Sequence, residues 1–245
     1  QQAVKWHLIH ANPCDLVDLP RHKAREMQAL NREEAAQLMA VETMTRKEGD
    51  RTVAVVNRYR VLFAFLLTTG ARPSEALGLK WTDVDLETGV ATIQRTLQWH
   101  RKTEGGGPYF GEPKTKGSRR TIPLPAGMVA QLKAHRAGQA AELFKLGVRS
   151  DLIFTTSEGT PVLRGNLVRR HYKPALKAAK LPESFPLYGL RHSCASLLLQ
   201  AGVHPKVVAE RLGHSSTTLT MDVYSHVAPG MQSEATTQLE RMLYG

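Results

Sequence analysis

Residues 61–75 read VLFAFLLTTGARPSE, an apolar run that passes through a glycine into an arginine, a proline and a glutamate. The run lies within residues 53–69, which are apolar on nearly every face of a helix, and such a helix is typical of the middle of a domain. Gly70 ends this helix, and Pro73 is well suited to open another, because a first-turn N–H has no partner within a helix. The stretch therefore predicts a buried helix followed directly by Arg72 and Glu75.

Outward from this helix, apolar residues recur mostly with helical spacing. Asn31 and Glu34 form a capping-box pattern at the start of one further helix. Between residues 90 and 124, β-branched residues alternate instead, around a Gly117–Ser118 turn. We therefore expect a mainly α domain with a small three-stranded antiparallel sheet that includes one hairpin, an α+β fold. The predicted strands cover residues 90–98, 109–116 and 119–124, and the predicted helices 31–47, 127–146, 167–179, 188–201, 205–211 and 231–243.

The charge of the chain is strongly positive and unevenly distributed. Lysine and arginine total 33 against 22 acidic residues, so the net charge is +11. This surplus points to a polyanionic partner, most often nucleic acid. Residues 164–180 contain many cations and no acid, and because a solvated helix face normally mixes signs, we expect this stretch to face phosphates. The predicted phosphate contacts are Arg119, Arg164, Arg169, Arg170, Lys173 and Lys177.

Other features of the sequence exclude several classes of protein. The apolar runs fall far short of the ~20 residues needed to cross a bilayer, and the chain opens without a charged and apolar leader. Cys14 and Cys194 lie far apart without metal-ligand spacing, so neither a zinc site nor a disulfide framework is indicated. We therefore expect a cytoplasmic protein that uses no metal or other cofactor and contacts no membrane.

Four short patterns carry residue types suited to chemistry on an anionic substrate. Residues 69–75 (TGARPSE) follow the buried helix, residues 112–116 (EPKTK) lie on the predicted hairpin, and residues 188–192 (YGLRH) open a helix. The fourth pattern joins residues 212–214 (LGH) to residues 224–226 (YSH). Each pattern alone has little specificity. Together and in this order, they resemble the catalytic domain of tyrosine recombinases, the phage integrase family.

The resemblance covers about residues 31–228 and implies the DNA breaking-rejoining fold of this family. It also implies an enzyme, a site-specific recombinase or integrase that cleaves and rejoins DNA strands through a covalent 3′-phosphotyrosine during integration or excision of a phage or mobile element. Residues 1–30 resemble the end of a preceding core-binding domain with its linker, which would make this chain an excised catalytic half. Residues 229–245 would form a separate C-terminal helix.

The chemistry of a phosphodiester explains why the family needs these residue types. Attack by a tyrosine builds a pentacoordinate phosphorane with added negative charge, which guanidinium groups stabilise because they are always charged and donate in a planar fork. The resemblance assigns this role to Arg72 and Arg191. It assigns the nucleophile to Tyr224 and a hydrogen bond to the phosphate to His214.

Three further roles follow from the resemblance, and two of them have alternatives. Glu75 would orient neighbouring groups of the site. The departing 5′ oxygen needs a proton, which Lys114 would supply. Lys116 is the alternative, because it lies on the same hairpin and its side chain faces the same side of the strand. Tyr188 stands where most family members have a histidine. Since tyrosine is a poor base at neutral pH, the general base is Tyr188 in an altered role, water, or no group at all.

The end of the chain has a different composition. Met231, Ala235, Leu239, Met242 and Leu243 follow a helical apolar stripe on a segment with little positive charge. In the family such a helix docks on a neighbouring protomer, which implies a homotetramer on double-stranded DNA. Packing of the helix on its own domain is the alternative.

Two other functions share part of this pattern. A type IB topoisomerase uses the same chemistry but swivels and reseals one strand, and the linker and the tail favour a recombinase over it. A non-catalytic DNA-binding protein could retain the fold, but it would not need the full set of chemical groups. That set is Arg72, Lys114, Arg191, His214 and Tyr224.

Overall fold

The structure is a computed structural model that describes residues 1–17, 28–48, 51–100, 105–112, 119–213 and 231–244. Within these ranges helices hold many more residues than strands, in agreement with the predicted α+β class. No helix in these ranges is both long enough and apolar enough to cross a membrane. The α-helices are α1 (Gln2–Lys5), α2 (Arg32–Ala40), α3 (Arg60–Thr69), α4 (Pro73–Leu77), α5 (Ala126–Leu146), α6 (Arg164–Leu167), α7 (Lys173–Ala178), α8 (Gly189–Gln200), α9 (Pro205–Leu212) and α11 (Met231–Leu243).

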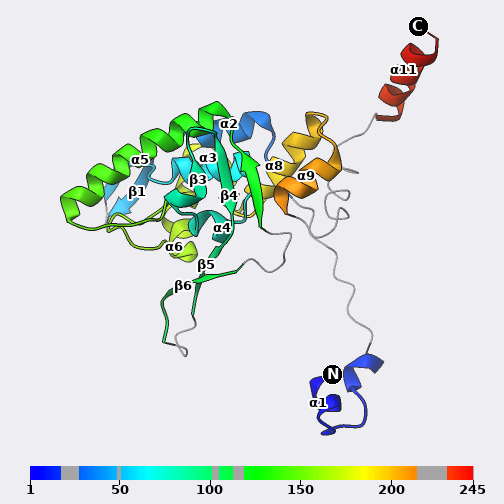
Figure 1. The fold of residues 1–245 in the computed structure, drawn as a ribbon. Helices are drawn as coiled ribbons and strands as arrows, with labels where there is room; N and C mark the ends of the chain where they lie inside the picture. The colour runs from blue at the N-terminus through cyan, green and yellow to red at the C-terminus, as the bar shows by residue number, and fades with distance from the viewer. Residues whose placement is uncertain (18–27, 49–50, 101–104, 113–118, 214–230, 245) are drawn as a thin grey trace.

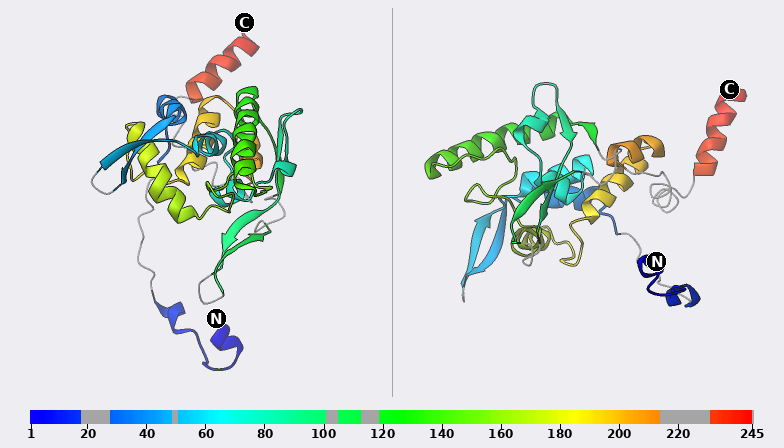
Figure 2. Two further views of the ribbon diagram at one scale, coloured as in Figure 1. Left: turned by 90° about the vertical axis from the view of Figure 1, so that its left-hand side faces the viewer. Right: turned by 60° about the horizontal axis from the view of Figure 1, so that its bottom comes forward.

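The described strands form three small antiparallel sheets. The three-stranded sheet lies in the body of the domain, and the two hairpins project from that body (Figures 1 and 2). The first hairpin joins β1 (Thr43–Glu48) to β2 (Arg51–Val56), the three-stranded sheet has the order β3 (Val84–Asp85), β4 (Val90–Ile93), β7 (Arg120–Pro123), and the second hairpin joins β5 (Thr96–Trp99) to β6 (Pro108–Gly111).

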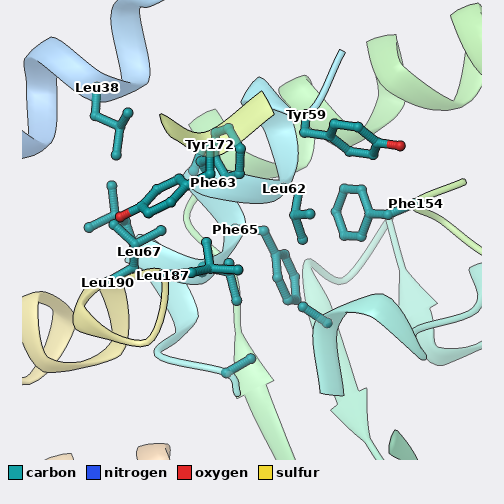
Figure 3. Close-up of a cluster of buried hydrophobic side chains, with 14 of the residues drawn as sticks. Leu38, Tyr59, Leu62, Phe63, Phe65, Leu67, Phe154, Tyr172, Leu187 and Leu190 are labelled. Carbon is teal, nitrogen blue, oxygen red and sulfur yellow. The ribbon is translucent and has the colours of Figure 1, made fainter. Parts of the chain in front are cut away.

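Helix α3 is the centre of the hydrophobic core, as its sequence predicts. Its residues from Leu62 to Leu67 are buried, and the close-up in Figure 3 shows its aromatic side chains meeting those of other elements. The ring of Phe63 lies 5.2 Å from that of Tyr172, and Phe65 lies 6.0 Å from Phe154, between ring centroids. Each fully buried side chain of this size contributes about 1.5–3 kcal/mol, so this helix determines how the other elements pack.

The region before α3 differs from the prediction. The capping box is confirmed, because the Asn31 side chain accepts from the Glu34 backbone N–H at 2.8 Å and Glu34 accepts in return at 2.9 Å. However, the helix ends at Ala40 instead of continuing to residue 47, and residues 53–56 belong to β2 instead of α3. The apolar residues of β2 pair across the hairpin with β1, and helical spacing in one segment contains no information about such a partner.

The predicted sheet is also wrong in its strand pairing. Strand β7 pairs with β4, and β6 pairs with β5, so residues 109–111 and 120–123 are not neighbours in one sheet. The predicted strand at residues 90–98 breaks in two because Gln94 and Arg95 both turn to the buried carboxylate of Asp83. Gln94 donates to Asp83 at 2.5 Å, and Arg95 forms an ion pair with the same group. This polar anchor bends the chain and separates β4 from β5.

The remaining helices agree with the prediction to within a few residues. Helices α5, α8, α9 and α11 cover the expected segments. In the expected helix 167–179, a π-helical turn at Val168–Tyr172 links α6 to α7. The segment 1–10 holds only the short α1, and the predicted linker begins with a 3₁₀ turn at Pro13–Leu16.

Candidate active site

Arg191 lies in the first turn of α8 and is almost completely buried, with 2% of its surface exposed. Its Nη1 donates to the carbonyl oxygen of Gly70 at 2.7 Å, while its Nε and Nη2 have no hydrogen-bond partner among the described residues. Burial and the nearby charge of Arg72 lower the pKa of Arg191 to about 10, so the group stays charged at neutral pH. A buried cation with unused donors is costly unless an anion binds it.

The carbonyl that holds Arg191 depends on the glycine at the end of α3. Gly70 has a φ of 65°, and a Cβ atom there would meet Leu212 Cδ2 at 2.2 Å and Cys194 Sγ at 3.3 Å. The neighbouring carbonyl of Thr68 accepts from Arg211 Nη2 at 3.0 Å. Two arginines thus bind the C-terminal end of α3, where the helix dipole favours positive charge.

Arg72 and Glu75 form the second part of the site, at the start of α4. Glu75 is 1% exposed, and its Oε2 accepts from the Arg72 backbone N–H at 2.9 Å. Its Oε1 accepts from Arg72 Nη1 at 2.8 Å, and Arg72 Nη2 donates to the carbonyl of Gly213 at 3.3 Å. The Arg72 side chain remains 32% exposed, so one carboxylate orients it while it stays accessible to a ligand.

Arg120 completes this group, although the sequence patterns did not single it out. Arg120 Nη2 donates to Glu75 Oε2 at 2.9 Å, Nη1 donates to Oε1 at 3.3 Å, and Nε donates to the Arg211 carbonyl at 2.7 Å. The neighbouring Arg119, which the sequence predicts as a phosphate contact, is 62% exposed and pairs with Glu112, and its role as a phosphate contact stays a prediction. The alternation of β7 contains the signal, because Arg120 has the same parity as the buried Ile122.

The electrostatic balance of the site is positive. Burial would raise the pKa of the Glu75 carboxyl, but the hydrogen bonds and charges of Arg120 and Arg72 outweigh burial, and the pKa is lowered. Glu75 is therefore ionised at neutral pH. In the described part of the chain, this one carboxylate faces the guanidinium groups of Arg72, Arg120 and Arg191, which leaves a surplus of positive charge for an anionic ligand.

Tyr188 precedes α8 and is partly exposed near Arg191. Its ring stacks edge-on against His192, with 5.2 Å between ring centroids. Burial and the charge of Arg191 lower the pKa of His192, so this histidine is neutral at physiological pH. The structure thus brings four of the predicted site residues to one region, namely Arg72, Glu75, Tyr188 and Arg191.

Four other predicted site residues lie outside the described ranges. They are Lys114, Lys116, His214 and Tyr224. The described chain does reach the residue before His214, since Gly213 ends α9 with a φ of 68° and accepts the hydrogen bond from Arg72.

The predicted phosphate contacts on residues 164–177 are all exposed and lie on the continuous α6, π-turn and α7 segment. Pro174 explains the π turn, because proline donates no N–H and its ring clashes with the carbonyl four residues earlier in a regular helix. His171 and Tyr172 turn inward. The outward cations form no ion pair with a described acid; they are Arg164, Arg169, Arg170, Lys173 and Lys177.

Comparison with known proteins identifies the class to which this fold and site belong. The sequence profile of the phage integrase family matches residues 28–231. The chain therefore belongs to the phage integrase family.

Relatives of known name agree with this assignment. The chain is 35% identical over 208 residues to a XerC-like tyrosine recombinase of Caldanaerobacter subterraneus, which covers 80% of this chain and 53% of that protein. It is 30% identical over 181 residues to the integrase of Staphylococcus phage L54a, which covers 72% of this chain and 50% of that protein. The chain thus spans about half the length of these relatives.

Solved structures show the same fold. The Tn1549 transposon integrase in complex with a circular intermediate DNA aligns with 98% of this chain and 74% of that one, at a TM-score of 0.70 and 25% identity. The XerH site-specific recombinase bound to its palindromic difH substrate aligns with 90% of this chain and 56% of that one, at a TM-score of 0.62 and 26% identity.

Proposed function

We propose that this chain is the catalytic part of a site-specific DNA recombinase, or integrase, that cuts and rejoins DNA strands through a covalent 3′-phosphotyrosine. The observation that carries the proposal is the cluster of buried Arg191, half-buried Arg72 and buried Glu75, in which Nε and Nη2 of Arg191 have no partner among the described residues. Both the Tn1549 integrase and XerH, which share this fold, are DNA-bound in their structures.

In the proposed reaction, the Tyr224 oxygen attacks the scissile phosphorus, and the bond from phosphorus to the 5′ oxygen breaks. Arg72 and Arg191 donate to the non-bridging oxygens, whose negative charge grows in the transition state. His214 donates a further hydrogen bond. Lys114 or Lys116 protonates the departing 5′ oxygen, which would otherwise leave as an unstable alkoxide.

The phosphotyrosine keeps the energy of the broken phosphodiester bond. A 5′ hydroxyl of another strand therefore attacks it in the reverse reaction, and no ATP is needed. The phenol of Tyr224 must lose its proton during attack, and the candidate acceptors are Tyr188 in an altered role, water, or no positioned group at all. Glu75 orients Arg72 for these steps.

The partner of this site is double-stranded DNA, in our proposal, and the basic residues of the α6 to α7 segment contact its backbone. Residues 1–30 serve as the link to a core-binding domain, residues 31–228 as the catalytic domain, and α11 as the contact between protomers of a homotetramer. The apolar side chains Leu239, Met242 and Leu243 of α11 are exposed, which suits docking on another protomer. We propose the cytoplasm as the location.

Covalent trapping tests the proposed function. Duplexes that bind the chain are selected from a randomised pool, cleavage positions are mapped, and a nick is introduced just beyond the cut so that the short 5′-hydroxyl fragment diffuses away. We expect a protein-linked DNA band on a denaturing gel for the chain and no band for Tyr224→Phe. A missing adduct with the intact chain, or an undiminished adduct with Tyr224→Phe, contradicts the proposal.

The same material separates the two alternatives. A non-catalytic DNA-binding protein would bind the duplexes but form no adduct. A type IB topoisomerase would relax supercoiled plasmid carrying one site without exchanging strands between two sites. We expect strand exchange, scored by the joining of differently labelled duplexes.

A further inference from the structure

Arg120 connects three elements that surround the proposed reaction site. It lies on β7, its Nη1 and Nη2 bind both carboxylate oxygens of Glu75 on α4, and its Nε binds the Arg211 carbonyl in the last turn of α9. Only 6% of its side chain is exposed. Each of its three guanidinium nitrogens thus donates to a protein oxygen in the described chain, whereas Nε and Nη2 of Arg191 have no partner there.

The charge of Arg120 changes what Glu75 does to Arg72. Alone with Arg72, the buried Glu75 carboxylate would neutralise that arginine, and a neutral pair attracts a phosphate poorly. With Arg120 on the other side, Glu75 shares its charge between two guanidinium groups. Arg72 is then held in position by Glu75 while the group as a whole keeps a positive charge.

Arg120 also packs against the end of α9, at the residue that precedes His214 in the sequence. Gly213 has a φ of 68°, and a Cβ atom there would lie 3.0 Å from Arg120 Nη1 and 3.1 Å from its Cδ. The Arg120 side chain therefore packs directly on the backbone of Gly213, whose carbonyl accepts from Arg72. Arg120 and Arg72 together attach the end of α9 to Glu75.

We propose that Arg120 is a positioning residue for strand cleavage, which orients Glu75 and offsets its charge so that Arg72 remains available to the scissile phosphate. The inference rests on the proposed function and deepens it. In this role, Arg120 contributes to the rate of cleavage only as far as the substrate phosphate is negatively charged, although Arg120 itself does not touch that phosphate.

The test compares a normal duplex with one that carries an uncharged methylphosphonate at the cleaved position. The full chain, Arg120→Met and Arg120→Lys are measured by the rate of adduct formation at saturating DNA. We expect Arg120→Met to slow cleavage of the phosphodiester by about 100-fold, comparable to the loss of one preorganised donor. It slows cleavage of the methylphosphonate by less than about tenfold, because that substrate demands less positive charge. Arg120→Lys keeps the charge and recovers part of the phosphodiester rate.

Arg95→Met is the matched control. Arg95 also pairs with a buried carboxylate, that of Asp83, but outside the proposed site. We expect it to lower thermal stability by an amount similar to Arg120→Met while both substrates react at the rate of the parent chain. The comparison therefore separates a loss of fold from a loss at the site.

Three other outcomes would contradict the proposed role or the proposed function. If Arg120→Met slows both substrates by the same factor, or slows neither, the proposed charge role is wrong. If Arg120→Lys is as slow as Arg120→Met on the phosphodiester, positive charge is not what Arg120 supplies. If the parent chain forms no adduct with either substrate, the proposed function itself fails, and that result is distinct from the other two.

Discussion

Two groups of cations in this protein differ in almost every physical respect. The arginines around Glu75 are buried or half-buried. Each donates hydrogen bonds to an acceptor on α4 or at the end of α3 or α9. The cations of residues 164–177 are exposed on one helical segment and pair with no described acid. The first group is held by hydrogen bonds within the protein, and the second is exposed to solvent.

The same type of side chain is thus suited to two different tasks. A guanidinium that is buried and held by a carboxylate is oriented before a ligand arrives, as stabilisation of one transition state requires. An exposed cation neutralises a phosphate and releases counterions, and its exact orientation matters little. We therefore expect mutations in the first group to change the rate of cleavage and mutations in the second group to change affinity and its salt dependence.

The largest effect is expected at Arg191. Arg191→Lys retains the charge but cannot donate from a planar fork, so the rate of adduct formation at saturating DNA falls by about 10²–10³-fold. The dissociation constant for DNA changes by about threefold or less, because lysine keeps the positive charge on which most of the affinity for phosphates depends. Single-turnover kinetics and a binding titration measure the two quantities. A rate close to that of the parent chain would remove the distinction between the two groups.

The second prediction concerns Glu75 and stability. Glu75→Gln removes the charge that compensates two buried or half-buried arginines, and we expect a loss of about 3–5 kcal/mol in the free energy of unfolding. Urea denaturation measures this loss. Glu34→Gln, in the capping box of α2, is a control with a small expected effect, because glutamine also accepts from the N-cap backbone.

Glu75 also predicts a pH dependence. Because its pKa is lower in the folded than in the unfolded chain, its contribution to stability is complete above the unfolded pKa and disappears as the pH falls through the folded pKa. The parent chain should therefore lose stability on acidification more steeply than Glu75→Gln. Parallel curves of unfolding free energy against pH would contradict this.

A smaller effect is expected at Gly70. Gly70→Ala forces a left-handed backbone on a residue with a Cβ atom, at about 1–2 kcal/mol, and pushes against Leu212. Because the Gly70 carbonyl holds Arg191, the rate of cleavage should fall together with the melting temperature. Gly138→Ala, where a Cβ atom has open space within α5, should leave the rate unchanged and raise the melting temperature slightly, because alanine favours a helix interior more than glycine does.

The smallest effect per residue is expected on the α6 to α7 segment. Each of Arg169→Ala, Arg170→Ala and Lys173→Ala should reduce the slope of log affinity against log salt by about 0.9 while the rate at saturating DNA stays constant. Binding titrations at several salt concentrations measure the slope. An unchanged slope in the triple variant would mean that this surface does not face DNA.

Sequence patterns predicted the local structure well where one segment contains its own signal. The α3 helix, its end at Gly70, the Asn31 capping box and the long α5 depend on residues near each other in the chain. The errors fall where the signal is a distant partner. The β1–β2 hairpin depends on cross-strand pairing, and the break between β4 and β5 depends on the carboxylate of Asp83.

For the candidate site, the residue types, the positive charge and the family follow from the sequence alone, because these depend on composition and on short motifs in a fixed order. The pairing of Arg120 with Glu75 is visible only in the folded protein. Folding alone brings Gly70 and Arg191, 121 positions apart, into hydrogen-bond distance. The physical reason is that hydrogen bonds and ion pairs act over a few ångströms in space, and separation along the chain says nothing about that distance until the core has packed.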